Sequence, residues 1–171
     1  MAAAESVDVF WSSATERADD VLVARIHALL GPGAISVGRL CPRCASSEHG
    51  RPWARFGDVD VPVSVSRSGP HLVTAVAPGA GAVGIDVEEI AAIERSWPDT
   101  VLAPGERAET ADERAQMWVA KEAILKAEGT GLSRPMDEVR LADHKVTRLE
   151  APPGYAAALA VTPVVEPVET R

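Results

Sequence analysis

Two short segments of the 171-residue chain place carboxylates and lysines at spacings that could support metal and phosphate chemistry. In the first, GIDVEEI, Asp86 and Glu88 lie two residues apart, and such residues share one face of a β-strand. In the second, WVAKEAILKAEGTGL, Glu122 and Lys126 lie four residues apart and share one face of a helix. Taken alone, this helix pair favours an exposed salt bridge. Taken with the strand carboxylates, it suggests a Mg²⁺ site for a polyphosphate-type ligand, because Mg²⁺ prefers carboxylate and phosphate oxygens.

The elements that must position these residues can be predicted from the spacing of apolar residues along the chain. Helices are expected at residues 15–31, where Gly31 and Pro32 end the pattern, and at residues 105–128, just before Gly129. A segment rich in turn formers, residues 41–58, predicts a loop or a tight hairpin. The expected strands are residues 7–12, 34–40, 59–69, 71–78, 80–90, 137–143, 145–151 and 154–162.

This order of elements predicts an α+β fold with two pseudo-symmetric lobes, each a small, mostly antiparallel sheet packed with one main helix. The expected lobes are an N-terminal one at residues 1–80 and a C-terminal one at residues 81–171, with the seam near residues 78–82. The tail at residues 163–171 has no core pattern and is expected to be loosely held. Both chemistry-bearing segments would belong to the C-terminal lobe.

The composition excludes some classes of protein. A net charge of -8 argues against a general nucleic-acid binder, although a local basic pocket for a phosphorylated ligand remains compatible with it. The longest mostly apolar stretch, YAAALAVTPVV, is too short to span a bilayer and contains Pro163. Because the first residues also lack a basic segment followed by an apolar one, we expect a cytoplasmic protein whose cysteines, Cys41 and Cys44, are reduced.

Four motifs together resemble those of the 4′-phosphopantetheinyl transferases. VGIDVE followed by WVAKEAILKAEGTGL resembles the two hallmark motifs of that superfamily, in the same order and at a similar separation. Upstream, CPRCASSEHGRPWA resembles its GKP-type loop, with Arg51 in place of the lysine, and VPVSVSRSGPHLVTAV resembles its ISHSGG strand. The motifs cover roughly residues 41–132. The arrangement is more similar to the monomeric Sfp type, with two lobes, than to the short trimeric holo-carrier synthases.

The resemblance implies an enzyme that moves the phosphopantetheine arm of coenzyme A onto a serine of an apo acyl or peptidyl carrier protein. Mg²⁺ is implied as cofactor and adenosine 3′,5′-bisphosphate as the second product, with the N-terminal lobe on the adenine and 3′-phosphate side. Glu122 and Lys126 are implied as the catalytic pair, the first as general base and the second at the leaving group. The other implied matches are Asp86, Glu88 and Glu122 for Mg²⁺, Lys121 and Lys126 for phosphate, Ser66 and Arg67 for pyrophosphate, and Gly50, Arg51 and Pro52 for adenine and 3′-phosphate.

The chain departs from the family pattern at three points. Arg67 stands where the family usually has histidine, so phosphate binding is kept while a proton-relay role is lost. The N-terminal lobe is short, and Arg17 is the one further candidate for the 3′-phosphate, although an exposed helix arginine is the simpler interpretation. Because carrier proteins are usually acidic and this chain is too, the docking surface is expected to be locally apolar or basic.

Two alternatives remain from the sequence. The first is a catalytically weak or inactive relative that binds coenzyme A or a carrier protein. The second is a zinc-knuckle interaction module built on Cys41, Cys44 and His49. Because one C-x-x-C and one histidine supply three ligands of the usual four, a plain structural loop is the favoured interpretation of that segment.

Overall fold

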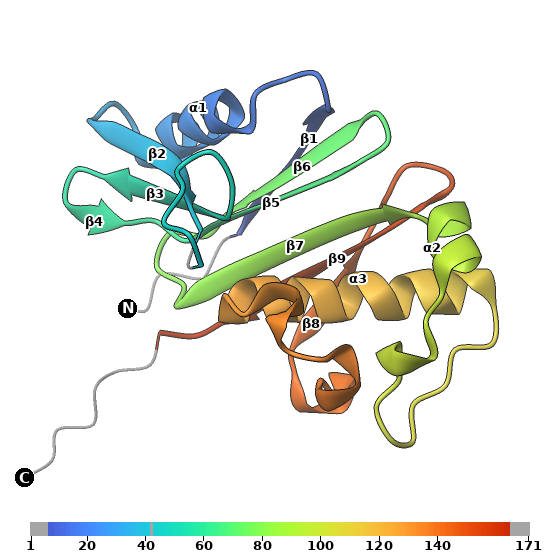
Figure 1. The fold of residues 1–171 in the computed structure, drawn as a ribbon. Coiled ribbons are helices and arrows are strands. Elements are labelled where there is room, and N and C mark those ends of the chain that lie inside the picture. The colour runs from blue at the N-terminus through green and yellow to red at the C-terminus, as the bar shows by residue number, and fades with distance from the viewer. Residues whose placement is uncertain (1–6, 42, 165–171) are drawn as a thin grey trace, which may run out of the picture.

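The computed structural model describes residues 7–41 and 43–164 of the chain. Within them lie three antiparallel three-stranded sheets and three α-helices, which confirms the expected α+β class. The first sheet has the order β1-β6-β5, with β1 at Asp8–Ser13, β6 at His71–Val76 and β5 at Val63–Ser68. Helix α1, Ala18–Leu30, covers one side of this half of the molecule (Figure 1).

The second sheet, β2-β3-β4, is formed within the segment where the sequence predicts one strand and then a loop or hairpin. It consists of β2 at Ile35–Leu40, β3 at Arg51–Phe56 and the short β4 at Val59–Asp60. The hairpin expectation is therefore confirmed, and β3 is its second strand. Leu40 pairs with Arg51, so residues 41–50 form a closed connection between β2 and β3.

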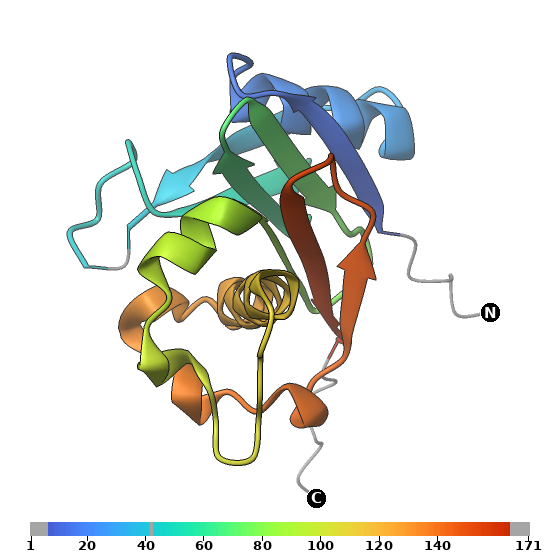
Figure 2. The ribbon, with the colours of Figure 1, turned by 90° about the vertical axis from the view of Figure 1, so that its right-hand side faces the viewer.

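The third sheet has the order β7-β9-β8, with β7 at Ala82–Glu89, β9 at Tyr155–Thr162 and β8 at Val146–Leu149. Helix α3, Ala111–Glu128, lies against this sheet, and the short helix α2, Ile90–Ser96, follows directly from β7. Figure 2 looks along α3 and shows it enclosed by the sheet on one side and by α2 and the turns after α3 on the other. Each half of the chain thus combines a sheet with a helix, as two pseudo-symmetric lobes would, while the boundary at residue 80 stays a prediction.

Three expected elements differ in the structure. The strand expected at residues 59–69 is divided into β4 and β5, which belong to different sheets. Residues 137–143 form no strand; they contain the short 3-10 turns Met136–Glu138 and Leu141–Asp143, which bring Val139 into the core around α3. Helix α3 begins at residue 111, not 105, because Thr110 and Glu113 form a capping box that satisfies its first amides. The expected loose tail at residues 163–171 lies mostly outside the described residues.

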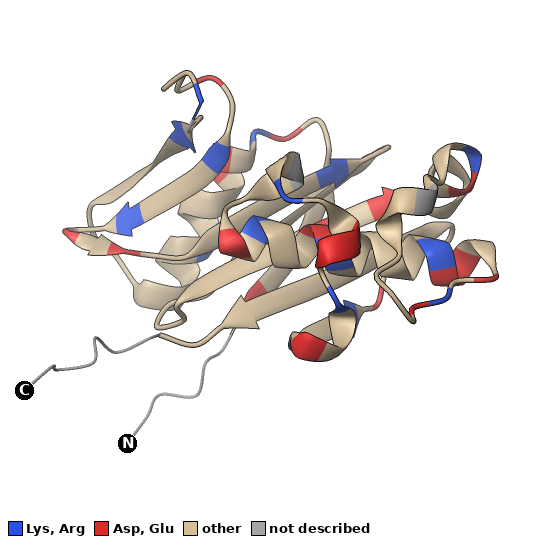
Figure 3. Cartoon of the chain, turned by 60° about the horizontal axis from the view of Figure 1, so that its bottom comes forward, with Lys and Arg blue, Asp and Glu red and all other residues tan. Residues whose placement is uncertain are grey.

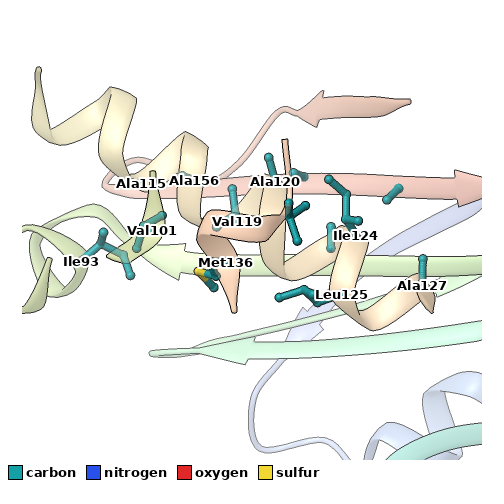
Figure 4. Packing of buried hydrophobic residues seen from close by; sticks show 14 residues of the cluster. Ile93, Val101, Ala115, Val119, Ala120, Ile124, Leu125, Ala127, Met136 and Ala156 are labelled. Carbon is teal, nitrogen blue, oxygen red and sulfur yellow. The ribbon is translucent and has the colours of Figure 1, made fainter. Parts of the chain in front are cut away.

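Small side chains allow α3 to approach its sheet closely. Ala115, Ala123 and Ala127 are buried on the helix, and Ala156, Ala158 and Ala160 are buried on β9 beneath it. Figure 4 shows this cluster, with Ile93, Val101 and Met136 closing the side of α3 that faces away from the sheet. The tightest approach is at Gly84 of β7, where a Cβ would overlap the backbone carbonyl of Ala123.

Replacing Gly84 with alanine should destabilise the protein by about 3 kcal/mol, because backbone atoms of α3, and not a flexible side chain, occupy the space of the new methyl group. Chemical unfolding monitored by circular dichroism measures the loss. Gly79→Ala is the control: unlike Gly84, Gly79 has a positive φ, of 84°, and its added Cβ meets no atom within 4 Å. Gly79→Ala should lower the free energy of unfolding by about 1 kcal/mol, from backbone strain alone. Equal losses in the two variants would contradict the close approach of α3.

Within the described part of the chain, no helix has the length and apolar character needed to cross a membrane.

Candidate functional site

A ladder of serine hydroxyls joins the first half of the molecule to the second. Ser64, Ser66 and Ser68 alternate along β5 and accept hydrogen bonds from the backbone N–H groups of Ile85, Val87 and Glu89 on β7, at 3.0, 3.3 and 3.2 Å. Because the partners advance two residues at a time on both strands, β5 and β7 lie side by side in the same direction. The ladder therefore fixes the position of the strand that carries Asp86 and Glu88.

The same hydroxyls hold the two strand carboxylates. Ser66 Oγ donates to Asp86 Oδ1 at 2.7 Å, and Ser68 Oγ donates to Glu88 Oε2 at 3.0 Å. Lys126 Nζ also donates to Asp86 Oδ1, at 2.6 Å, and reaches the carbonyl of Ile85 at 3.1 Å. Asp86 is only 2% exposed. Ser66 and Ser68 thus each support the backbone of β7 and orient a carboxylate on it.

These groups border a cavity of about 430 Å³ between the two halves of the molecule. Arg39 from β2, Ser66 and Arg67 from β5, Asp86 and Glu88 from β7, and Trp118, Glu122 and Lys126 from α3 line it, together with Val65. Three acidic and three basic side chains therefore face one space. Elsewhere the two signs are interspersed along the ribbon, as Figure 3 shows.

The acidic groups of the cavity have raised pKa values. Burial and the neighbouring charge of Asp86 raise the pKa of Glu122 to about 7, although Lys126 opposes the shift. Burial likewise raises the pKa of Asp86 against the effect of Lys126, and burial together with Asp86 raises that of Glu88. Groups held this way favour a bound cation, because a positive charge would relieve the repulsion among them.

The raised pKa of Glu122 predicts how stability depends on pH without metal. The folded protein holds this proton up to about pH 7, whereas the unfolded chain releases it near 4.5. The stability that results is fully present below pH 4.5 and is lost as the pH rises through 7. Glu122→Gln should therefore be more stable than the parent at pH 8 by about 2 kcal/mol, with the difference vanishing below about pH 4.5. Urea unfolding in a chelator at several pH values measures this, and a pH-independent difference would contradict it.

The carboxylates of the cavity fit a hard divalent cation. Asp86 Oδ2 is buried and, within the described residues, has no hydrogen-bond partner, which is costly for a carboxylate oxygen unless a cation satisfies it. Glu88 and Glu122 offer further oxygens at the same cavity. The three do not bring one oxygen each within 4.8 Å of one another in this structure. Three carboxylates are the kind of donor set that a hard divalent cation binds, and side-chain adjustment would be needed to bring their oxygens together.

Several residues implied by the sequence do not lie at the cavity. The Lys121 side chain is fully buried on another face of α3, where its ammonium donates to Glu106 Oε2 and to the carbonyls of Val101 and Met136. In this arrangement the Lys121 ammonium therefore cannot contact a phosphate. Arg17 is an exposed residue at the start of α1 that pairs with Asp20 at 3.6 Å, in agreement with the simpler interpretation of it.

The basic residues from the first half donate to backbone carbonyls, and Arg51 reaches one in the second half. Arg51, which starts β3 between Gly50 and Pro52, donates from Nη2 to the carbonyl of Ala127 near the end of α3, at 3.3 Å. Arg67 donates to the carbonyls of Ala14 and Glu16 at 3.3 and 2.8 Å. Arg67 lines the cavity, whereas Arg51 does not.

Sequence reasoning missed two contributors to the site. Arg39 lines the cavity from β2 and donates to the carbonyl of Gly50 at 3.3 Å, but nothing in its local pattern distinguishes it from an ordinary strand arginine. The ladder, by contrast, had a readable signal. Small hydroxyl residues at alternate positions of a strand mark a face that can approach another backbone closely, and SVSRS has that alternation.

Comparisons with known proteins bear on the same region. Residues 82–158 match a family model described as ACPS, 4′-phosphopantetheinyl transferase superfamily. A search of curated proteins found no match. The matched residues begin at β7 and run through α3 to β9, and so include Asp86, Glu88, Glu122 and Lys126. In that region the chain is similar to the 4′-phosphopantetheinyl transferase superfamily.

Proposed function

We propose that the protein transfers the 4′-phosphopantetheine arm of coenzyme A to a serine hydroxyl of an apo acyl or peptidyl carrier protein. The observation that carries this proposal is the cavity between the two halves, where Asp86, Glu88 and Glu122 face Lys126 and two arginines. The family match over β7 and α3 supports it independently. Phosphoryl transfer depends mainly on positioning and charge neutralisation, and this set of groups supplies both.

We assign Asp86, Glu88 and Glu122 as the residues that would hold Mg²⁺. When bound, Mg²⁺ would neutralise charge on the pyrophosphate of coenzyme A and so improve the bisphosphate as a leaving group. The buried, unpartnered Oδ2 of Asp86 and the raised pKa values of all three carboxylates support this assignment. The serines of β5 would act as positioning residues, since Ser66 and Ser68 orient two of the three carboxylates.

The basic residues of the cavity are proposed to bind the phosphates. Lys126 is 28% exposed and lies beside Asp86, so its ammonium can turn from that carboxylate to a phosphate oxygen. Arg39 and Arg67 would bind from the first half, and an arginine suits phosphate because it can donate two hydrogen bonds at once. We place Gly50, Arg51 and Pro52 beside the adenine and 3′-phosphate. Lys121 has no place in this set, because its partners make it a buried structural residue.

The transfer step requires a base for the serine of the carrier. The serine oxygen attacks the phosphorus attached to the pantetheine arm, and the bond from that phosphorus to the bridging oxygen of the pyrophosphate breaks. Glu122 would accept the serine proton, directly or through water, while Lys126 stabilises the charge that develops on the leaving adenosine 3′,5′-bisphosphate. A carboxylate positioned beside the attacking serine can accept its proton as a general base.

A single chain would suffice for the reaction in this proposal. The first half brings Arg39, Ser66 and Arg67 to the cavity, and the second half brings the carboxylates, so no second copy is needed to complete it. This supports the monomeric, two-lobed Sfp type over a trimeric synthase.

The experiment that tests the function is incubation of the purified protein with coenzyme A, Mg²⁺ and apo carriers from fatty-acid, polyketide and peptide synthesis. Adenosine 3′,5′-bisphosphate is then quantified by chromatography. We expect it to form only when both Mg²⁺ and an accepted carrier are present. If no carrier yields the bisphosphate although calorimetry shows that coenzyme A binds, the protein is a non-catalytic relative and the proposal is wrong.

A further inference from the structure

The connection between β2 and β3 gathers three metal-binding side chains outside the cavity. Its sequence, CPRCASSEHG, has the spacing C-x2-C-x4-H, and the ligand atoms of Cys41, Cys44 and His49 all lie within 4.8 Å of one another. It is the one such group of three among residues 7–41 and 43–164. Cys44 Sγ and His49 Nε2 are 3.4 Å apart. Sulfur and nitrogen ligands on one tetrahedral zinc ion would be separated by about 3.6 Å, given the usual bond lengths.

The backbone of this loop is shaped around the first sulfur. The N–H groups of Arg43 and Cys44 are directed at the Cys41 thiol. Amides directed at a sulfur stabilise the thiolate, which is the form that binds metal. Ala45 adopts a φ of 55°, an uncommon conformation for a residue other than glycine, and its N–H donates to the carbonyl of Cys41 at 2.9 Å. The loop therefore maintains a strained turn that keeps both cysteines on one side.

We propose that Cys41, Cys44 and His49 bind one Zn²⁺ ion. Two thiolates and an imidazole form a ligand set that suits zinc and excludes Mg²⁺ or Ca²⁺, which prefer oxygen. No fourth side chain joins the group within the described residues, and Cys44 and His49 are exposed. The fourth position therefore faces solvent and takes a water molecule.

The ion would fix the end of the β2–β3 connection that directly precedes Arg51. His49 immediately precedes Gly50, whose φ of 106° folds the chain back against the backbone of Leu40 and Cys41. Arg51 follows and contacts the end of α3 through Ala127. A zinc ion at one end of this short connection would thus fix the position of Arg51, which the proposed function assigns to the adenine and 3′-phosphate side. Metal binding itself does not depend on that function.

The test is the zinc content of reduced protein loaded with Zn²⁺ and passed through gel filtration, measured by mass spectrometry of the elements. We expect one zinc per chain in the parent and in Ser47→Ala, a matched control at an exposed position of the same loop. Cys44→Ser and His49→Ala should each lose most of the metal. His49→Cys should keep the metal, because a thiolate can replace the imidazole as a zinc ligand. If His49 had only a structural role, cysteine would have no reason to preserve zinc binding better than alanine does. Co²⁺ in place of Zn²⁺ should give the intense thiolate-to-metal absorption of a tetrahedral site.

Three results would overturn the proposal. One is the absence of zinc from the folded parent under reducing conditions, and another is equal zinc content in the parent and Cys44→Ser. The third is a disulfide between Cys41 and Cys44 that persists in mild reductant and lowers the intact mass by about 2 Da. Because none of these measurements uses coenzyme A or a carrier, a failure here is distinct from a failure of the proposed transfer reaction.

Discussion

Asp86→Asn should lower the rate of phosphopantetheinyl transfer at least about 100-fold, while the chain remains folded. Asparagine preserves the shape of the side chain and can still accept the hydrogen bond from Ser66. It removes the negative charge that Lys126 and the proposed Mg²⁺ both use. Initial rates at several Mg²⁺ concentrations measure the effect, and we expect excess Mg²⁺ to recover little activity because a ligand of the ion has changed.

Glu89→Gln is the matched control for that variant. Glu89 is on the same strand three residues further on, does not line the cavity, and lies 3.8 Å from Arg95 in a solvent-exposed pair. Exposed ion pairs of this kind contribute little to stability, so Glu89→Gln should remain folded and transfer at nearly the parental rate. A parental rate in Asp86→Asn, or an equal loss in both variants, would remove Asp86 from the metal site.

Glu106→Ala should destabilise the protein by about 3–5 kcal/mol, because it leaves the buried ammonium of Lys121 without its carboxylate partner. Lys121 is 0% exposed, whereas the Glu106 side chain is 12% exposed and also accepts from the amides of Ala103 and Leu141. These hydrogen bonds, together with the one from Lys121, lower the pKa of Glu106 although burial alone would raise it. Removing Glu106 should therefore destabilise the protein more than removing Lys121.

Lys121→Met provides the comparison. It leaves Glu106 with two amide donors and some solvent, so it should cost less than Glu106→Ala, and the double variant should be less destabilised than the sum of the two. Urea unfolding of the parent, the two single variants and the double variant completes this double-mutant cycle. Because Lys121 does not line the cavity, Lys121→Met should also retain transfer activity below its unfolding temperature. A large loss of activity in folded Lys121→Met, or equal costs for the two single variants, would contradict the buried structural role.

The carboxylates were the part of the site that the sequence could reveal. Asp86 and Glu88 share a strand face and Glu122 shares a helix face with Lys126, and these periodicities are properties of the local backbone. That the strand and the helix face one cavity depends on how closely they pack. Gly84 permits that packing, but a glycine at this position in the sequence does not predict which element packs against it.

Lys121 shows where spacing alone was insufficient. Next to a predicted metal ligand and in a lysine-rich motif, it resembles a phosphate contact. Three residues before it stands Trp118 and four after it Leu125, so it lies on an apolar stripe of α3, and this signal favoured burial. Its partner, Glu106, lies in the irregular segment before α3, and the sequence gives no register for such segments.

The irregular segments account for the remaining differences in the fold. Residues 137–143 contain Val139 and Leu141 at alternate positions, which is the pattern of a strand, yet they form 3-10 turns around the core of α3. Val139, Leu141 and the small Ala142 are too few apolar residues to distinguish a strand from 3-10 turns. The start of α3 was readable, since Thr110 and Glu113 have the spacing of a capping box.

The intact mass of an apo carrier protein after incubation with this protein, coenzyme A and Mg²⁺ tests the central claim most directly. We predict a gain of about 340 Da, the mass of one phosphopantetheine arm, located on a single serine and absent when Mg²⁺ is chelated or Asp86→Asn replaces the parent. An unchanged carrier mass with every class of carrier, in the presence of folded protein and bound coenzyme A, would contradict the claim.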